Sequence, residues 1–217
     1  MKGYKSGFTL VETLVALAIF SVVMVVSGGI VLSLISSNRQ NQAVNSVVNN
    51  LSYSIESMVR DIKTGYEYKC NYPTGSTNAY AKSTFKDALD NCTVGTSINN
   101  IALISNITGN EVVVRYDFVT QVDAPGYIKK TVFTEDSLGG IITENSYPLT
   151  DTQNIDMTDV RFKINPGKPL YQGEAVNIDA VQPSVFVMMK GTAKVNAVSI
   201  SDFFMQTFIS QRLPNFI

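Results

Sequence analysis

Residues 1–34 read MKGYKSGFTLVETLVALAIFSVVMVVSGGIVLSL. Lys2 and Lys5 precede Gly7, and Glu12 is the only charged residue between Phe8 and Leu34. An apolar run of this length is sufficient to span a bilayer, which requires roughly 20 residues. Backbone groups in lipid must pair within the segment, so the run is predicted to be helical. The lysines on its N-terminal side favour retention of that end in the cytoplasm.

A cleaved secretory signal peptide also begins basic and continues apolar. Its apolar core is shorter, however, and ends in a cleavage site of the A-x-A type. No such site follows Leu34, where the chain continues without a helix breaker, so this alternative is disfavoured.

Glu12 leaves two interpretations open. It is either a protonated side chain near the edge of an ordinary anchor, or a functional charge that needs a cation placed near it in the membrane.

Composition limits the classes of function. The 217 residues suffice for the anchor helix and one further domain, and the formal net charge is −1. Because the charge balance is not basic, no nucleic-acid partner is predicted. The chain contains no histidine, the most frequent general base and metal ligand, so an enzyme is not expected.

The cysteines predict a disulfide. Cys70 and Cys92 are the only two, and a bond between them would close a loop of 23 residues. In an oxidising compartment outside the cytoplasm this bond would stabilise the fold by about 3 kcal/mol on the chain-entropy model. Two unpaired thiols are the alternative.

No metal site is predicted, because two cysteines without histidine do not complete a zinc site. Asp151, Asp156 and Asp159 cluster in the segment DTQNIDMTD. Their spacing lacks the alternating carboxylates and the central glycine of an EF-hand loop. A solvated loop is therefore expected there, with calcium as the remaining cofactor alternative.

Beyond Asn38, apolar residues recur in steps of three and four, which predicts that the helix continues to Thr64 and stops at Gly65. Glu56, Arg60 and Asp61 fall outside this stripe. The stripe consists of Val44, Val47, Val48, Leu51, Ile55, Met58, Val59 and Ile62.

Residues 65–100 are rich in polar and small side chains and are predicted to form a long connecting region, with a short helix at Phe85–Leu89. From Ile101 onward β-branched and aromatic residues predict strands. The predicted strands are Ile101–Ser105, Glu111–Thr120, Tyr127–Glu135, Gly140–Glu144, Val160–Asn165, Ser184–Lys190 and Asn196–Ile209. By its pattern alone, the stretch Phe203–Arg212 within and after the last of these could be strand or helix. Turns are expected at Thr108–Asn110, Ala124–Gly126 and Asn165–Pro169. Consecutive strands with short turns favour an antiparallel meander with one face on the helix, which is an α+β fold.

The segment Gly7-Phe8-Thr9-Leu10-Val11-Glu12, behind a basic leader, resembles the class III signal of type IV pilins and of the pseudopilins of type II secretion. The resemblance implies that a membrane aspartyl prepilin peptidase cuts between Gly7 and Phe8 and N-methylates Phe8. It also implies that the Glu12 carboxylate neutralises the freed α-amino group of Phe8 between neighbouring subunits during assembly. Such a pair is strong out of water because each charge would otherwise be stranded.

Gly28 and Gly29 lie near the outer end of the apolar run. Paired glycines lower helix propensity and mark sites for kinks, although they also permit close packing against a neighbouring helix. In filaments of the type IV family this part of the helix is often unwound. The resemblance therefore implies local melting at these two glycines.

Together these features predict a non-enzymatic structural subunit, of the minor class, of a type IV pilus or a type II secretion pseudopilus. The expected divisions are a leader at 1–7, a membrane or filament-core helix at 8–35, an amphipathic continuation at 36–64, and a β-rich domain at 65–217 with a variable region at 65–100. The resemblance implies four partners: prepilin peptidase, other pilin or pseudopilin subunits, the inner-membrane assembly platform, and lipid before assembly.

The expected location is the bacterial inner membrane, single-pass with the N-terminus inside, and the extracytoplasmic filament after assembly. The alternative is an uncleaved single-pass membrane protein that displays a β-rich receptor or adhesin domain.

Overall fold

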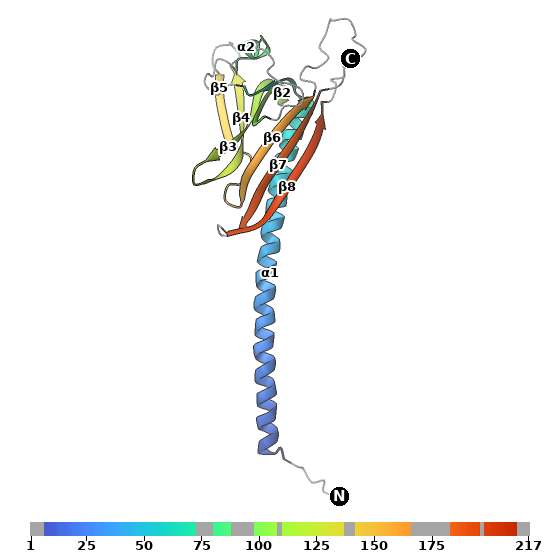
Figure 1. Ribbon diagram of the computed structural model, residues 1–217, viewed down its shortest axis with the longest axis vertical. Helices are drawn as coiled ribbons and strands as arrows, with labels where there is room; N and C mark the ends of the chain where they lie inside the picture. The colour runs from blue at the N-terminus through green and yellow to red at the C-terminus, as the bar shows by residue number, and fades with distance from the viewer. Residues whose placement is uncertain are drawn as a thin grey trace. The chain divides into compact units, whose positions relative to one another are not determined.

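The computed structural model describes residues 7–72, 80–87, 98–107, 110–136, 142–165, 183–195 and 198–211. Helix α1 spans Leu10–Thr64 and contributes to two compact units, Met1–Gln42 and Ala43–Ile217 (Figure 1). The helix ends at the predicted residue. It begins two residues after the predicted start at Phe8, because Thr9 caps it.

In the first unit, α1 has the length and apolar composition needed to cross a membrane. The membrane-length window is 0% buried within the chain, so its apolar side chains have no intramolecular core. The chain is helical through Gly28 and Gly29, and a Cβ at either position would meet no atom within 4 Å. Melting at these glycines concerns the assembled filament and stays a prediction.

The second unit contains two antiparallel sheets, which with α1 confirms the α+β class (Figure 1). The first sheet has the order β1 (Tyr66–Cys70), β2 (Asn100–Ile107), β3 (Asn110–Gln121), β4 (Ala124–Glu135) and β5 (Ile142–Pro148). The second has the order β6 (Ile155–Asn165), β7 (Ser184–Val195) and β8 (Val198–Ser210). The meander is therefore divided, since β6 does not continue from β5 but starts a new sheet. A short helix, α2 (Lys82–Asp87), precedes β2.

Each predicted strand corresponds to an observed one, and the helix predicted at Phe85–Leu89 overlaps α2, with residues 88 and 89 outside the described part. The sequence missed β1. This strand is only five residues long, and Glu67 within it has a φ of 54°, where the register with β2 shifts. So short and irregular a strand does not produce the alternation by which strands are found.

The turn predicted at Ala124–Gly126 is wrong. The β3–β4 hairpin turns at Val122 and Asp123, and Asp123 takes the positive φ of 63° that a tight turn requires. Gly126 instead serves packing, because a Cβ there would collide with the backbone carbonyl of Met157 on β6. The other two predicted turns include residues 108–109 and 166–169, which lie outside the described residues.

The core of the second unit is built on one face of α1 and takes side chains from both sheets. Of the predicted stripe, Val44 and Val48 are 37% and 50% exposed and do not belong to the buried face. The residues that α1 does bury are Val47, Leu51, Ser54, Met58, Asp61 and Ile62. The sequence pattern placed Asp61 outside the buried stripe, and this prediction is wrong because Asp61 is buried. Ser54 is accommodated because its hydroxyl donates to the carbonyl of Leu149 at 2.8 Å.

Gly65 ends α1 for a steric reason. A Cβ at this position would collide with the Leu103 side chain and the Asp61 carbonyl, so only glycine lets the chain turn from the helix against β2.

Candidate functional site

The first candidate site is the entry to α1. Residues 7–9 are not helical, and the Thr9 Oγ1 atom accepts a hydrogen bond from the backbone N–H of Glu12 at 3.3 Å. Thr9 is therefore an N-cap, and Thr9-x-x-Glu12 has the spacing of a capping box. Glu12 also lies in the first turn, where the helix dipole favours a negative charge. The Thr9-x-x-Glu12 spacing in the sequence is the signal of this local role, which was not predicted.

The junction between Gly7 and Phe8 is accessible. Phe8 is 79% exposed, and a Cβ at Gly7 would meet no atom within 4 Å. Nothing in the described part of the chain therefore requires glycine at position 7. A need for the smallest residue there would have to come from outside the described part of the chain, as from a processing enzyme.

Glu12 makes no ion pair among the described residues. The basic residues of the leader, Lys2 and Lys5, lie outside the described part of the chain. The assembly role assigned to Glu12 needs a cation from a processed Phe8, and this pairing stays a prediction.

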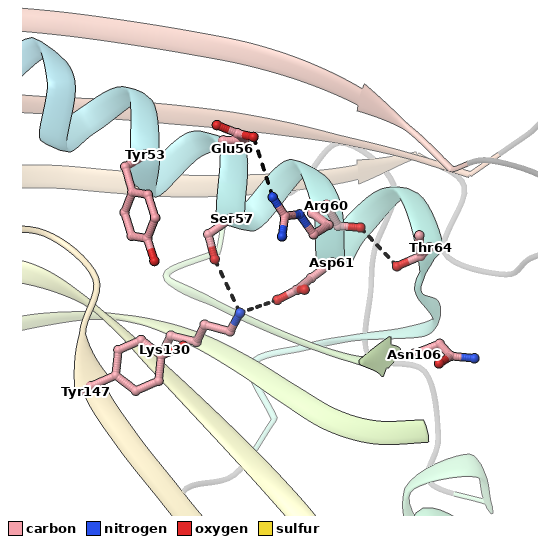
Figure 2. Close-up of a pocket in the computed structure, with 9 residues that line it drawn as sticks. All are labelled: Tyr53, Glu56, Ser57, Arg60, Asp61, Thr64, Asn106, Lys130 and Tyr147. Atoms are coloured by element: carbon pink, nitrogen blue, oxygen red, sulfur yellow. Dashed lines mark hydrogen bonds and ion pairs between the residues drawn. The ribbon is translucent and has the colours of Figure 1, made fainter. Parts of the chain in front are cut away.

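The second candidate site is a groove of about 690 Å³ within the second unit, shown in Figure 2. Its rim carries Tyr53 and Tyr147, which are 66% and 44% exposed, and the surface pair Glu56–Arg60, whose charged atoms are 3.5 Å apart. The lining residues are Tyr53, Glu56, Ser57, Arg60, Asp61 and Thr64 of α1, Asn106 of β2, Lys130 of β4 and Tyr147 of β5.

A buried ion pair forms the floor of this groove. The Lys130 Nζ atom lies 2.6 Å from Asp61 Oδ2 and donates to Ser57 Oγ at 3.3 Å (Figure 2). The side chains of Asp61 and Lys130 are each 7% exposed. Tyr116 of β3 donates its hydroxyl to the same Asp61 oxygen at 2.5 Å. One carboxylate thus joins the helix to two strands.

The surroundings of Asp61 also act on Tyr116. Burial raises the pKa of the Tyr116 hydroxyl well above its ordinary value, and the negative charge of Asp61 and the hydrogen bond to it raise that pKa further. The phenol is therefore kept neutral and able to donate. Because its charged and polar groups pair with one another, the floor is a structural element, and the exposed tyrosines and charges of the rim are left for contact.

The three aspartates considered for calcium have other partners. Asp151 accepts the Gln153 backbone N–H and the Asn154 amide at 2.8 and 2.7 Å. Asp156 lies 2.6 Å from Lys194 Nζ, and Asp159 lies 2.9 Å from Arg161 Nε. Within the described ranges, no three acidic, cysteine or histidine side chains gather as a metal site would require.

Asp156 also links the two sheets, since it accepts the Gly126 backbone N–H at 2.9 Å. Partial burial alone would raise the pKa of Asp156, but the hydrogen bonds from Lys194 and Gly126 and the Lys194 charge lower it overall.

Cys70 ends β1 and is disulfide-bonded. Cys92 lies outside the described residues, so its pairing with Cys70 stays a prediction.

Comparison with known proteins finds a likeness at the N-terminus. Residues 2–28 match the family model of the prokaryotic N-terminal methylation motif. No curated protein and no solved structure matches the chain. The matched segment contains the basic leader, the Gly7–Phe8 junction, Glu12 and the first part of α1. This motif on an apolar helix is consistent with a type IV pilin-like protein.

Proposed function

We propose that this chain is a structural subunit, of the minor class, of a type IV pilus or a type II secretion pseudopilus. In this proposal prepilin peptidase cleaves between Gly7 and Phe8 and N-methylates Phe8. The subunit is then held in the inner membrane by α1 until it joins the filament. The observation that carries the proposal is the methylation motif at residues 2–28 on a helix whose membrane-length window is 0% buried.

The exposed helix supports an assembly role. A row of apolar side chains with no intramolecular core is unstable in water and needs lipid or other helices around it. Lipid would surround the helix before assembly, and the helices of other subunits would replace it in the filament. Because such helices offer few polar contacts, a pair between Glu12 and the α-amino group of Phe8 would fix their register.

The test is the N-terminus of the mature protein. The full-length chain is produced with an active prepilin peptidase, purified from membranes, and analysed by intact mass and N-terminal sequencing. The expected product begins at N-methylated Phe8, and production with an inactive peptidase should leave Met1 in place.

Gly7→Val provides the matched variant, because a Cβ at position 7 would meet no described atom within 4 Å, so the substitution should affect cleavage alone. A chain that still begins at Met1 beside an active peptidase would overturn the proposal.

That outcome would favour the alternative of an uncleaved anchor that displays a receptor or adhesin domain. The groove with exposed Tyr53 and Tyr147 at its rim is the observation that supports this alternative.

A further inference from the structure

The groove beside α1 has the size and the shape of a ligand site. Its volume of about 690 Å³ falls within the range of roughly 300–1,000 Å³ that small-molecule sites occupy. Six of its nine described lining residues lie on α1, which rises about 16 Å between Tyr53 and Thr64. Figure 2 shows Tyr53 and Tyr147 at one end of the groove and Thr64 and Asn106 at the other. The groove is therefore elongated and suits a ligand of several linked units.

The charges of the described lining balance one another. Glu56 and Arg60 form the exposed pair at the rim, and Asp61 and Lys130 form the buried pair at the floor. These two anions and two cations have no net charge. A polyanion such as a nucleic acid requires a surplus of cations, which these lining residues do not supply. The lining therefore fits an uncharged ligand.

The lining is also polar throughout. Each of the nine described side chains carries an oxygen or nitrogen atom, and a lipid chain would leave those that it covers without partners, at a cost in free energy. An extended peptide gains affinity from the open main chain of a sheet edge. The groove instead presents mainly one face of α1, whose backbone groups are already paired within the helix. A lipid chain and an extended peptide are therefore both disfavoured.

The two tyrosines add aromatic surfaces to this polar groove. Tyr53 of α1 and Tyr147 of β5 are 66% and 44% exposed. A sugar ring has faces of C–H groups that pack on aromatic rings and an edge of hydroxyls that form hydrogen bonds. Planar side chains with neighbouring polar atoms, such as Glu56, Arg60 and Asn106, match adjacent hydroxyls. The exposed Glu56–Arg60 pair is free to rearrange around a ligand, since surface ion pairs contribute little to stability.

We propose that this groove binds a neutral oligosaccharide. The sugar rings pack on Tyr53 and Tyr147, and the hydroxyls form hydrogen bonds with Glu56, Arg60 and Asn106. The buried ion pair at the floor holds α1 and β4 in position beneath the ligand.

The inference goes beyond the proposed function and does not depend on cleavage at Gly7–Phe8. All the described lining residues belong to the second unit, so the unprocessed chain should bind the sugar as the processed chain does. Failure to bind sugar and failure of cleavage are therefore separate results.

The test is saturation-transfer difference NMR of the full-length chain, in a detergent without a sugar headgroup. The probes are maltotriose, chitotriose, mannotriose and lacto-N-tetraose, which are neutral and together present glucose, N-acetylglucosamine, mannose and galactose. At least one probe should bind, with transfer to the C–H protons of its ring faces. A heparin tetrasaccharide is the charged comparison. Binding of the neutral probe should not change with salt, because no net charge is screened.

Single variants locate the site. Tyr53→Ala and Tyr147→Ala should each weaken binding about tenfold or more, because each removes a ring face. Tyr53→Phe should retain most of the affinity, since the ring remains. Phe208→Ala is the matched control, because Phe208 is 67% exposed, close to the value for Tyr53, but lies on β8 outside the described lining. Its affinity for the probe should equal that of the unsubstituted chain.

Three outcomes would each overturn the proposal. The first is that no neutral probe binds. The second is that a probe binds but neither tyrosine variant weakens it more than Phe208→Ala does, which would place the sugar elsewhere on the chain. The third is that the heparin tetrasaccharide binds more tightly than every neutral probe, with an affinity that falls steeply as salt rises.

Discussion

Lys130→Met should destabilise the second unit strongly, because it leaves the Asp61 carboxylate buried without its cation. The pair is direct, at 2.6 Å, and both side chains are 7% exposed. Breaking a buried ion pair by removing one partner costs about 3–5 kcal/mol. Tyr116 still donates to Asp61 in the variant, which offsets part of this loss. We therefore expect a loss at the lower end, about 3 kcal/mol, or a Tm lower by about 10 °C.

The matched control is Lys129→Met, one residue earlier on β4. Lys129 is half-buried and makes no ion pair among the described residues, so the expected change is within about 0.5 kcal/mol. A triple variant, Asp61→Leu with Tyr116→Phe and Lys130→Met, removes the ion pair and the Tyr116 hydroxyl together and leaves only the half-buried Ser57 hydroxyl of the cluster. Because no charge is then stranded, it should regain most of the stability lost by Lys130→Met.

The assay is urea unfolding of the full-length chain in mild detergent, followed by near-UV circular dichroism of its ten tyrosines, since the chain has no tryptophan. A loss of less than about 1 kcal/mol for Lys130→Met would refute the reasoning. It would mean that water entering through the groove already screens Asp61, and that the floor is not a dry ion pair.

Three further predictions concern single sites. The stability that neutral Tyr116 confers is complete below its unfolded-state pKa of about 10 and falls as pH rises above it. Above that pH, the urea midpoint of the Tyr116→Phe variant should therefore fall less steeply with pH than that of the unsubstituted chain. Equal slopes for the two chains would contradict a buried, neutral Tyr116. Peptide mapping without reductant should recover Cys70 joined to Cys92, and reduction should cost about 3 kcal/mol. Free Cys92 in the exported protein would disprove the pairing. Glu12→Gln should leave cleavage by prepilin peptidase intact and reduce incorporation into filaments, measured as sheared filament protein against membrane protein. Normal incorporation of the variant would show that the charge of Glu12 does not set the register of the helices.

The parts of the fold that the sequence predicted are those determined by neighbouring residues. The end of α1 at Thr64 follows from apolar spacing and from Gly65, which the close approach of β2 then explains. Strands β2, β3 and β7 were found because their β-branched and aromatic runs are long. The irregular strand β1 gives no such pattern and was missed.

Asp61 could not be placed correctly from its neighbours. On a helical stripe a carboxylate is expected to face water, and nothing near it in the sequence suggests otherwise. Its partners, Tyr116 and Lys130, lie on β3 and β4 and reach Asp61 only after the sheet has formed. The groove could not be predicted for the same reason, because its lining residues come from α1 and three strands that meet only in the folded chain.

The entry to α1 shows how a local role and a partner role can coincide in one residue. Glu12 has the position of a capping-box residue, so its presence behind Thr9 could be explained without any second subunit. Glutamine at the same position retains the hydrogen-bonding ability of such a residue but carries no charge. If Glu12 only supports the start of the helix, Glu12→Gln should assemble nearly as the unsubstituted chain does, because it loses only the small helix-dipole contribution of about 0.3–1 kcal/mol. If its charge neutralises the amino group of Phe8, the same substitution strands that cation among apolar helices, where an unpaired charge is costly. The difference between these outcomes separates the two roles, which Glu12→Val, by removing both, would leave confounded.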